Sequence, residues 1–120
     1  KGVCLDTDVL IDSFKGDPRE VRGYYVTCIS LYEFLRGLAF LGKDVNEFKA
    51  WIEANMNVVC IDNRAIKVAS RIYAELRKEG KLIEDPDLLI ASICIANGLV
   101  LKTGNRRHFE RLEKYGLKLA

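Results

Sequence analysis

The chain has 120 residues, a net charge of +2, and a composition that is 49% hydrophobic and 30% charged. This length predicts one domain with one core, spanning residues 1–120, and the composition is typical of a globular protein in water. No apolar segment reaches the roughly 18 residues that a membrane-spanning helix requires. Because the sequence also opens without the regions of a signal peptide, we expect a cytoplasmic protein with no membrane partner.

Short apolar runs alternate with helical patterns along the chain. We expect strands at residues 3–5, 24–29, 58–61, 99–102 and 117–119. Helices are expected at residues 9–14, 30–41, 45–51, 64–78, 85–96 and 108–115. The helix at 85–96 is apolar almost all round, which predicts a central, buried position. Strands that alternate with helices predict an α/β domain with a mainly parallel central sheet.

The four cysteines are not arranged as a metal or redox motif. Cys4, Cys28, Cys60 and Cys94 each stand inside an apolar stretch, and His108 is the only histidine. The simplest interpretation is four buried thiols that behave as small hydrophobic side chains. The high content of charged residues favours a thermophilic source, in which an intracellular disulfide is less surprising.

Polar side chains follow several predicted strands at the edge where ligands bind in parallel sheets. They are Asp6, Asp8, Glu33, Asp85, Asp87 and Asn105. Carboxylates that meet in one crevice repel each other, and a hard divalent cation relieves that repulsion. Mg²⁺ prefers oxygen ligands and keeps several waters, and two such ions can support hydrolysis of a phosphodiester. The pattern therefore predicts a metal site at this edge.

Each acid also has a structural interpretation. Glu33 completes a Ser30-x-x-Glu33 capping box, which would tie it to the start of its own helix. Asp85 or Asp87 suits the N-cap of the buried helix, and Asp8 suits the N-cap of the first helix. These alternatives stay open on the residues alone.

Three stretches, in order, resemble one family. They are LDTDVLID at residues 5–12, SLYEFLRG at 30–37 and DLLIASICIANGLVLKTGNRRHFERL at 87–112. Together they resemble the PIN domain, specifically the small toxin ribonucleases of the VapC type, over nearly the whole chain. The resemblance implies a three-layer α/β/α sandwich and Mg²⁺- or Mn²⁺-dependent cleavage of RNA phosphodiester bonds. It also implies a cognate antitoxin that covers the acidic crevice, and a homodimer whose interface involves residues 30–57.

Carried over by motif, the resemblance implies metal-binding and catalytic roles for Asp6, Glu33 and Asp87. Ser30 matches the usual hydroxyl residue three positions before the acid, and we expect it to contact the substrate.

One departure from the family pattern concerns its last motif. The family often has a fourth acid where this chain has Asn105 or His108, so the metal site is expected to be weaker. Asp85 or Asp8 would then fill the gap, and Asn105 is a further candidate ligand, weaker because its amide oxygen is neutral.

A local excess of Lys and Arg marks the end of the chain, from residue 100 to residue 120. Such an excess suits contacts with phosphate groups, although a solvated helix face has the same composition. We expect Arg106, Arg107 and Arg36 to hold the RNA backbone.

Three alternatives to a toxin remain open at this stage. Asp6-Thr7-Asp8 comes close to the signature of haloacid-dehalogenase-like phosphatases, but Leu10 and the short chain count against it. The substituted last motif allows a PIN-like binding module without activity. A PIN nuclease that matures cellular RNA has the same sequence features as a toxin.

Overall fold

A five-stranded parallel sheet forms the centre of the molecule. The computed structural model describes residues 2–120, in which the strands are β1 (Val3–Leu5), β2 (Tyr25–Thr27), β3 (Asn57–Val59), β4 (Val100–Lys102) and β5 (Lys118–Leu119). The strand order is β3-β2-β1-β4-β5, and every neighbouring pair is parallel. The predicted parallel sheet is therefore confirmed.

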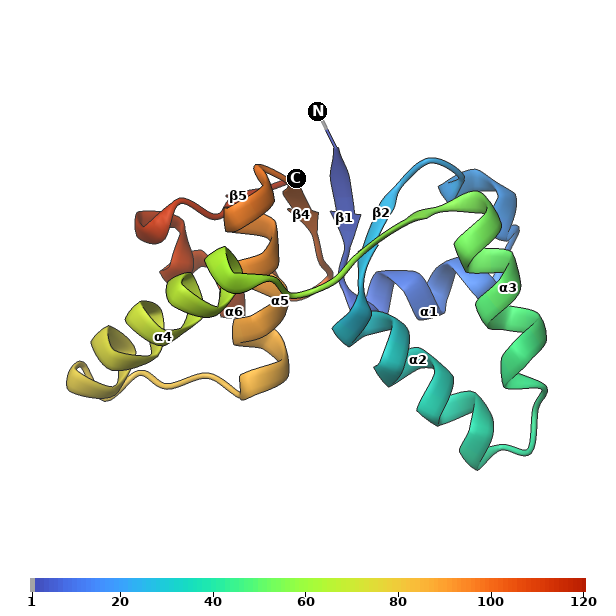
Figure 1. Ribbon diagram of the computed structural model, residues 1–120, viewed down its shortest axis with the longest axis horizontal. Coiled ribbons are helices and arrows are strands. Elements are labelled where there is room, and N and C mark those ends of the chain that lie inside the picture. Colours follow the sequence, from blue (N-terminus) through green and yellow to red (C-terminus); the bar gives the residue numbers. More distant parts are fainter. Residues whose placement is uncertain (1) are drawn as a thin grey trace.

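Helices cover both faces of this sheet and make three layers (Figure 1). The helices α1 (Thr7–Lys15), α2 (Cys28–Phe40) and α3 (Val45–Asn55) lie on one side. The helices α4 (Asn63–Lys78), α5 (Asp85–Asn97) and α6 (Arg106–Phe109) lie on the other. Two 3₁₀ helices complete the chain, η1 (Pro18–Val21) and η2 (Glu110–Tyr115). This arrangement is the expected α/β/α fold.

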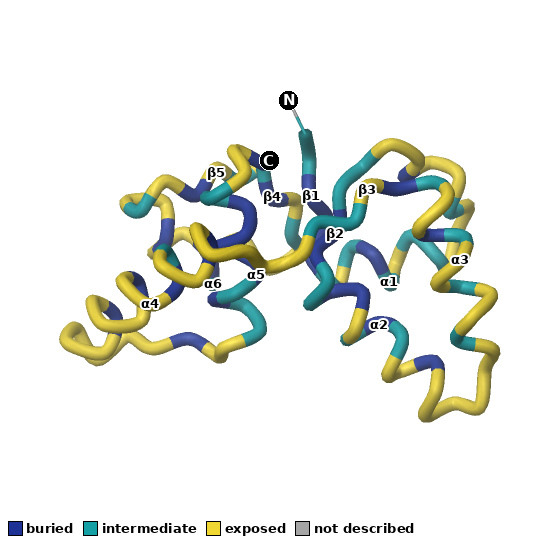
Figure 2. Tube along the Cα trace, viewed as in Figure 1, coloured by how far each residue is buried: buried dark blue, intermediate teal, exposed yellow. Residues whose placement is uncertain are grey.

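The core is divided by the sheet, because successive side chains of a strand point to opposite faces. Cys4 belongs to the core under α4 and α5, whereas the next residue, Leu5, belongs to the core under α1, α2 and α3. Buried positions run along the strands and α5, while the outer faces of α3 and α4 are exposed (Figure 2). The predicted central position of the helix that begins at Asp85 is confirmed.

The start of α2 differs from the prediction, and the difference bears on the site. Residues 24–29 were expected to be strand, but α2 begins at Cys28 because the side chain of Thr27 caps it. The Thr27 hydroxyl accepts from the backbone N–H of Ser30 over 3.1 Å. Ser30 is thus inside the helix, and the predicted Ser30-x-x-Glu33 capping box is wrong.

Two further capping predictions are also wrong. Asp6, not Asp8, is the N-cap of α1, since its side chain accepts from the N–H of Thr7. Glu84 occupies the N-cap of α5, and no side-chain cap bond is made there. Asp85 and Asp87 therefore lie in the first turn of α5 rather than at its cap.

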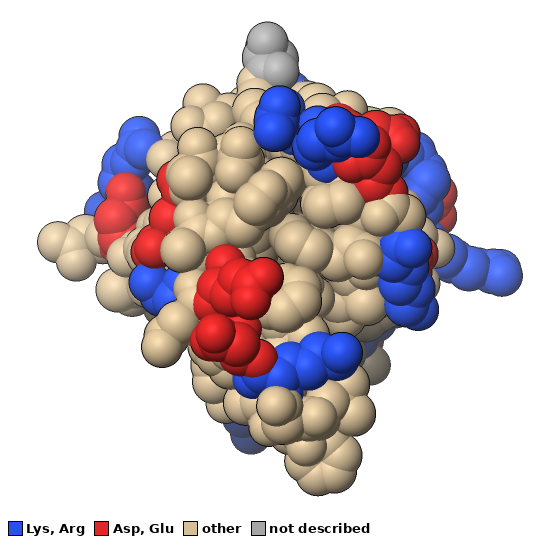
Figure 3. Space-filling model, turned by 90° about the vertical axis from the view of Figure 1, so that its right-hand side faces the viewer, with Lys and Arg blue, Asp and Glu red and all other residues tan. Residues whose placement is uncertain are grey.

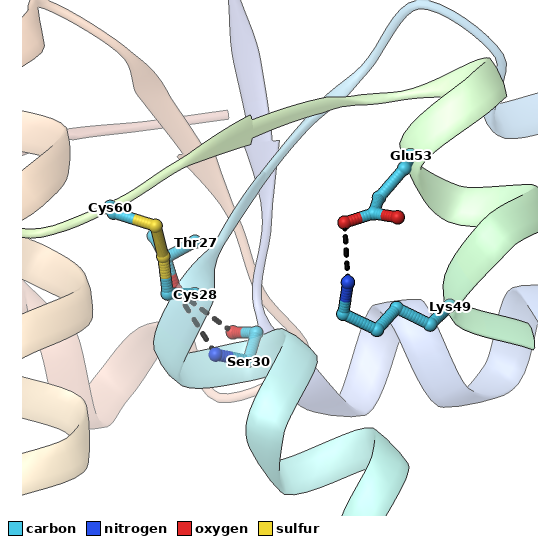
Figure 4. The surroundings of a disulfide bond; sticks show 6 residues. All are labelled: Thr27, Cys28, Ser30, Lys49, Glu53 and Cys60. Atoms are coloured by element: carbon cyan, nitrogen blue, oxygen red, sulfur yellow. Dashed lines mark hydrogen bonds and ion pairs between the residues drawn. A yellow bond between two sulfur atoms is a disulfide. The ribbon is translucent and has the colours of Figure 1, made fainter. Parts of the chain in front are cut away.

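A disulfide joins Cys28 to Cys60, so the expectation of four free thiols is wrong for this pair. The cause is the register of β2 and β3, in which Thr27 is the partner of Val59. The next residues are the two cysteines, and their Cα atoms are 4.9 Å apart, within the range that a disulfide bridges. Figure 4 shows the bond beside Thr27 and Ser30. Cys4 and Cys94 are free and buried.

The last predicted helix, at residues 108–115, is divided into α6 and η2. Across residues 2–120, none of the helices has both the length and the apolar character needed to cross a membrane.

Candidate active site

A crevice of about 380 Å³ opens where β1, β2 and β4 end. Its lining combines carboxylates with one cation and is formed by Asp6, Thr7, Asp8, Ile11, Glu33, Arg36, Asp87 and Asn105. The parallel order of the strands explains the convergence, because each strand delivers its following residues to the same edge.

Asp6 is the most buried acid of the crevice, with 7% of its surface exposed. One carboxylate oxygen accepts from the N–H of Thr7 over 2.8 Å, and the other accepts from the hydroxyl of Thr103 over 2.7 Å. Burial raises the pKa of the Asp6 carboxyl above its usual range, although both hydrogen bonds lower it. The nearby charges of Asp8 and Asp87 raise this pKa further.

Glu33 is held from the opposite wall by a hydroxyl of α1. The Thr7 hydroxyl donates to the Glu33 carboxylate over 2.6 Å and lies 2.9 Å from the hydroxyl of Ser30. Arg36 approaches the other carboxylate oxygen of Glu33, at 3.7 Å. Glu33 therefore points across the helix interface into the crevice, and no capping bond of its own helix accounts for its position.

Ser30 has no exposed surface. Its hydroxyl lies within hydrogen-bond distance of the Thr7 hydroxyl and, at 3.5 Å, of the Thr27 hydroxyl. The expected contact of Ser30 with a substrate does not suit this buried position. Its side chain instead supports Thr7, which holds Glu33.

Asp87 enters the crevice from the first turn of α5. Its carboxylate lies 2.9 Å from Nε2 of His108. Burial raises the pKa of Asp87, while the charge of His108 and its hydrogen bond lower it. The charge of Glu33 raises the pKa of Asp87, as expected for acids that share a crevice.

Asp8 and Asn105 line the same crevice at its exposed rim. One oxygen of Asp8 accepts from the N–H of Gly104 over 3.1 Å, and the other accepts from the N–H of Val9 over 2.8 Å. A Cβ atom at Gly104 would come within 2.5 Å of the Asp8 carboxylate, so only glycine fits there without displacement. Asp8 thus ties α1 to the loop after β4.

Asp85 stands outside the crevice. It lines a different pocket between α4 and α5, together with Ser70 and Tyr73. Its expected contribution to the metal site is therefore not supported by its position, because residues two apart on a helix point in different directions.

The three predicted RNA-binding arginines have different surroundings. Arg36 lines the crevice and stacks over the ring of Tyr32 at 5.3 Å. The guanidinium of Arg106 donates to the backbone carbonyl of Ala120, away from the acids. Arg107 is exposed. Of the three, Arg36 is the one that lines the crevice.

The oxygen donors of the crevice suit Mg²⁺ or Mn²⁺, which prefer carboxylates and retain water. As the side chains stand in residues 2–120, no three His, Cys, Asp or Glu residues form a ready cluster of direct ligands. Thr103, Thr7 and His108 make hydrogen bonds to the carboxylates of Asp6, Glu33 and Asp87. The donor set therefore fits a cation held partly through water.

Thr7 and Thr103 are the site residues that sequence reasoning missed. Each follows a buried strand by one or two positions, at the edge where the acids were expected. A hydroxyl side chain just after a strand was the sequence feature that could have identified both residues. Only the fold shows which carboxylate each hydroxyl contacts.

Comparison with known proteins identifies the family of this chain. The profile described as "PIN domain" matches residues 3–115. Ribonuclease VapC1 of Methanocaldococcus jannaschii is 40% identical over 120 residues, covering 98% of this chain and 85% of that protein. The tRNA(fMet)-specific endonuclease VapC of Shigella flexneri is 29% identical, covering 90% of this chain and 89% of that protein.

The fold matches a solved structure over its whole length. VapBC-1 from nontypeable Haemophilus influenzae superposes with a TM-score of 0.81 at 23% identity, covering 100% of this chain and 97% of that one. The chain belongs to the PIN domain family and, within it, to the VapC-type ribonucleases. The predicted family is confirmed, and the phosphatase alternative is set aside.

Proposed function

We propose that this chain is an endoribonuclease that uses Mg²⁺ or Mn²⁺, with Asp6, Glu33 and Asp87 as the residues that hold the cation. The observation that carries the proposal is the convergence of three carboxylates from three separate helices in one crevice. Burial raises the pKa of both Asp6 and Asp87, which indicates charges held without full compensation. Such a site gains stability when a cation binds.

A divalent cation bound there would supply charge neutralisation and water activation for hydrolysis of a phosphodiester. The remaining roles belong to the chain. Thr7 holds Glu33 across the crevice, and Thr103 fixes the Asp6 carboxylate. Arg36, at the rim, offers a positive charge to the RNA backbone, and the exposed Arg107 offers a second.

For the substrate, we propose single-stranded RNA in the cytoplasm. Two relatives are named as a ribonuclease and as a tRNA(fMet)-specific endonuclease, which supports RNA as the class of substrate. For the partner, we propose an antitoxin that places a basic side chain among the crevice acids. Four acids and the single cation Arg36 line that crevice, so a cation from a partner would be attracted.

We also propose a homodimer that uses the exposed apolar residues of α2 and of the turn after it. Phe40 is 90% exposed, Leu41 is 67% exposed and Tyr32 is 61% exposed. The side of the molecule formed by α1, α2 and α3 has broad uncharged areas between separate acidic and basic groups (Figure 3). Exposed apolar surface of this kind favours association. Light scattering of the wild type and of Phe40→Glu tests the dimer, which we expect the variant to lose.

A PIN-like binding module without activity is the second candidate. The observation that favours it is the engagement of Asp87 by His108, in the motif where the family often has another acid. In that case the protein would bind RNA but leave it intact in the presence of Mn²⁺.

Paired variants of α5 separate these functions. Asp87→Asn removes an acid of the crevice, whereas Asp85→Asn removes an acid of the same helical turn that lies outside it. With Mn²⁺ and a fluorescent RNA, we expect cleavage to fall on the order of 100-fold or more for Asp87→Asn and to change little for Asp85→Asn. Equal rates for the two variants would overturn the proposed site, and no cleavage by the wild type would favour the binding module.

A further inference from the structure

We propose that the outer face of α4 is a phosphate-binding surface along which RNA runs as it approaches the crevice. This inference rests on the proposed nuclease function and extends it to a part of the molecule outside the active site. The helix carries five Lys or Arg residues against the single acid Glu75, a local net charge of +4 in a chain whose net charge is +2.

Four of these residues share one side of the helix, and we call them the α4 stripe: Arg64, Lys67, Arg71 and Lys78, with Ala74 and Glu75 between the last two. Their spacings of three, four and seven residues place them on one side of a helix. All four are exposed, while the opposite side of α4 buries Ala65, Ala69, Ile72 and Leu76. At 1.5 Å per residue the α4 stripe is about 21 Å long, enough to follow several phosphate groups.

The charges of the α4 stripe are not used within the protein. Across residues 2–120, none of the four side chains makes an ion pair or a side-chain hydrogen bond. Basic residues near the end of the chain differ, since Lys114 pairs with Glu79 and Arg111 donates to the carbonyl of Lys81. The α4 stripe is therefore available to an external anion.

Stability of the helix accounts for Lys78 in the last turn, where the helix dipole favours a cation, but not for Arg64. Arg64 lies in the first turn of α4, where the helix dipole favours an acid and opposes a cation. No acid occupies that first turn, although Asp62 caps the helix from the preceding position. A cation at this end of the helix costs stability unless something outside the fold uses it.

The start of the α4 stripe is fixed close to the α2 wall of the crevice. The disulfide between Cys28 and Cys60 joins the first turn of α2 to the segment just before α4, which places Arg64 near that turn. Figure 4 shows the disulfide at the start of α2. RNA on the stripe would therefore be led towards the wall that carries Glu33.

Charge complementarity selects RNA as the occupant. The crevice is lined by four acids, so it repels a phosphodiester chain until a cation is bound. A nuclease with such a crevice needs positive charge outside it to hold the flanking phosphates. A row of unpaired Lys and Arg supplies that charge without sequence preference.

Fluorescence anisotropy tests the proposal with a fluorescein-labelled single-stranded RNA in EDTA, where cleavage does not interfere. The stripe variant is Lys67→Ala/Arg71→Ala/Lys78→Ala, because alanine preserves an exposed helix. The control is Lys15→Ala/Arg22→Ala/Lys43→Ala, which changes the net charge equally at exposed positions elsewhere. Circular dichroism verifies that both variants fold.

We expect the stripe variant to bind RNA on the order of 10-fold more weakly, and its slope of log K against log salt to decrease by about 2. The control variant should change the affinity for RNA less than about 2-fold. Its three charges lie away from the α4 stripe, so salt screens them from RNA that is bound there. Equal weakening of the two variants, or wild-type affinity in the stripe variant, would overturn the inference.

The outcome for the α4 stripe is separable from that for the proposed function. If the wild type cleaves RNA but the stripe variant binds as tightly as the wild type, only the inference fails. If no protein cleaves RNA but the stripe variant alone binds weakly, the inference stands and the nuclease function fails.

Discussion

Thr7 and Glu33 are joined across the crevice by a hydrogen bond of 2.6 Å, from the hydroxyl in the first turn of α1 to the carboxylate on α2. The two residues are 26 positions apart in the chain, and the bond fixes one helix relative to the other at the site. It makes Thr7 a positioning residue for Glu33.

Thr7→Val keeps the shape of the side chain and removes this hydrogen bond. We expect the rate of RNA cleavage to fall roughly 10-fold, because Glu33 loses the group that holds it, and the free energy of unfolding to fall by about 1 kcal/mol. Thr7→Ser retains the hydroxyl and serves as the control. Comparable losses of cleavage in both variants would indicate that the hydroxyl of Thr7 does not position Glu33.

Asp6→Asn is predicted to stabilise the metal-free protein at neutral pH. The pKa of Asp6 is raised in the folded state, chiefly by burial, so the folded protein binds its proton more tightly than the unfolded protein. The contribution of Asp6 to stability is therefore present below the usual pKa of an aspartate and is lost as the pH rises through the folded pKa. Asn still accepts the N–H of Thr7, so the cap of α1 survives.

Urea denaturation in EDTA at acidic and neutral pH tests this prediction. The free energy of unfolding of Asp6→Asn should exceed that of the wild type increasingly as the pH rises. A variant that is less stable at neutral pH than the wild type would show that Asp6 serves the fold rather than a ligand.

Gly104→Ala is predicted to destabilise the protein by about 0.5–1.5 kcal/mol, the contribution of one hydrogen bond. The new Cβ atom would come within 2.5 Å of the Asp8 carboxylate and break its hydrogen bond to the backbone. Gly37→Ala is the matched control, since nothing lies within 4 Å of a Cβ atom there and alanine favours its helix by about 0.5–1 kcal/mol. Thermal denaturation measures both changes.

A double variant shows whether Asp8 is the cause. In Asp8→Ala/Gly104→Ala the clash is absent, so the two losses should be less than additive. If the losses of the two single variants add fully in the double variant, the effect of Gly104→Ala does not depend on Asp8.

Reduction of the disulfide between Cys28 and Cys60 is predicted to lower the free energy of unfolding by about 3–4 kcal/mol, because the bond closes a long loop in the unfolded chain. Denaturation with and without dithiothreitol measures the loss. Cys28→Ala/Cys60→Ala is the control, and its stability should not respond to dithiothreitol. If dithiothreitol destabilised this variant as much as the wild type, the sensitivity to dithiothreitol would not come from the disulfide.

The sequence predicted the parallel sheet and a site at the ends of its strands because strand ends are local features, whereas the set Asp6, Glu33 and Asp87 was implied by the resemblance to PIN domains. Asp6 directly follows an apolar run, and in a parallel sheet that alone places it at the edge where ligands bind. The same reasoning did not separate Asp87 from Asp85, since the direction of each side chain depends on how α5 packs.

Partners across the crevice were not predictable from one sequence. Thr103 meets Asp6 from 97 positions away, and His108 meets Asp87 from 21 positions away. The disulfide depends on the register that sets Thr27 opposite Val59, which no local pattern encodes. Thr27 is both the last residue of β2 and the N-cap of α2, so the predicted strand at residues 24–29 was extended two residues too far.

Crystals grown or soaked with Mn²⁺ test the central claim most directly, through the anomalous difference map of the wild type and of Asp6→Asn. We predict a Mn²⁺ peak in the crevice of the wild type, with the carboxylates of Asp6 and Asp87 in its coordination shell, directly or through water, and no peak there in Asp6→Asn. An empty crevice in wild-type crystals that hold Mn²⁺ at another site, or a peak that persists in Asp6→Asn, would contradict the account.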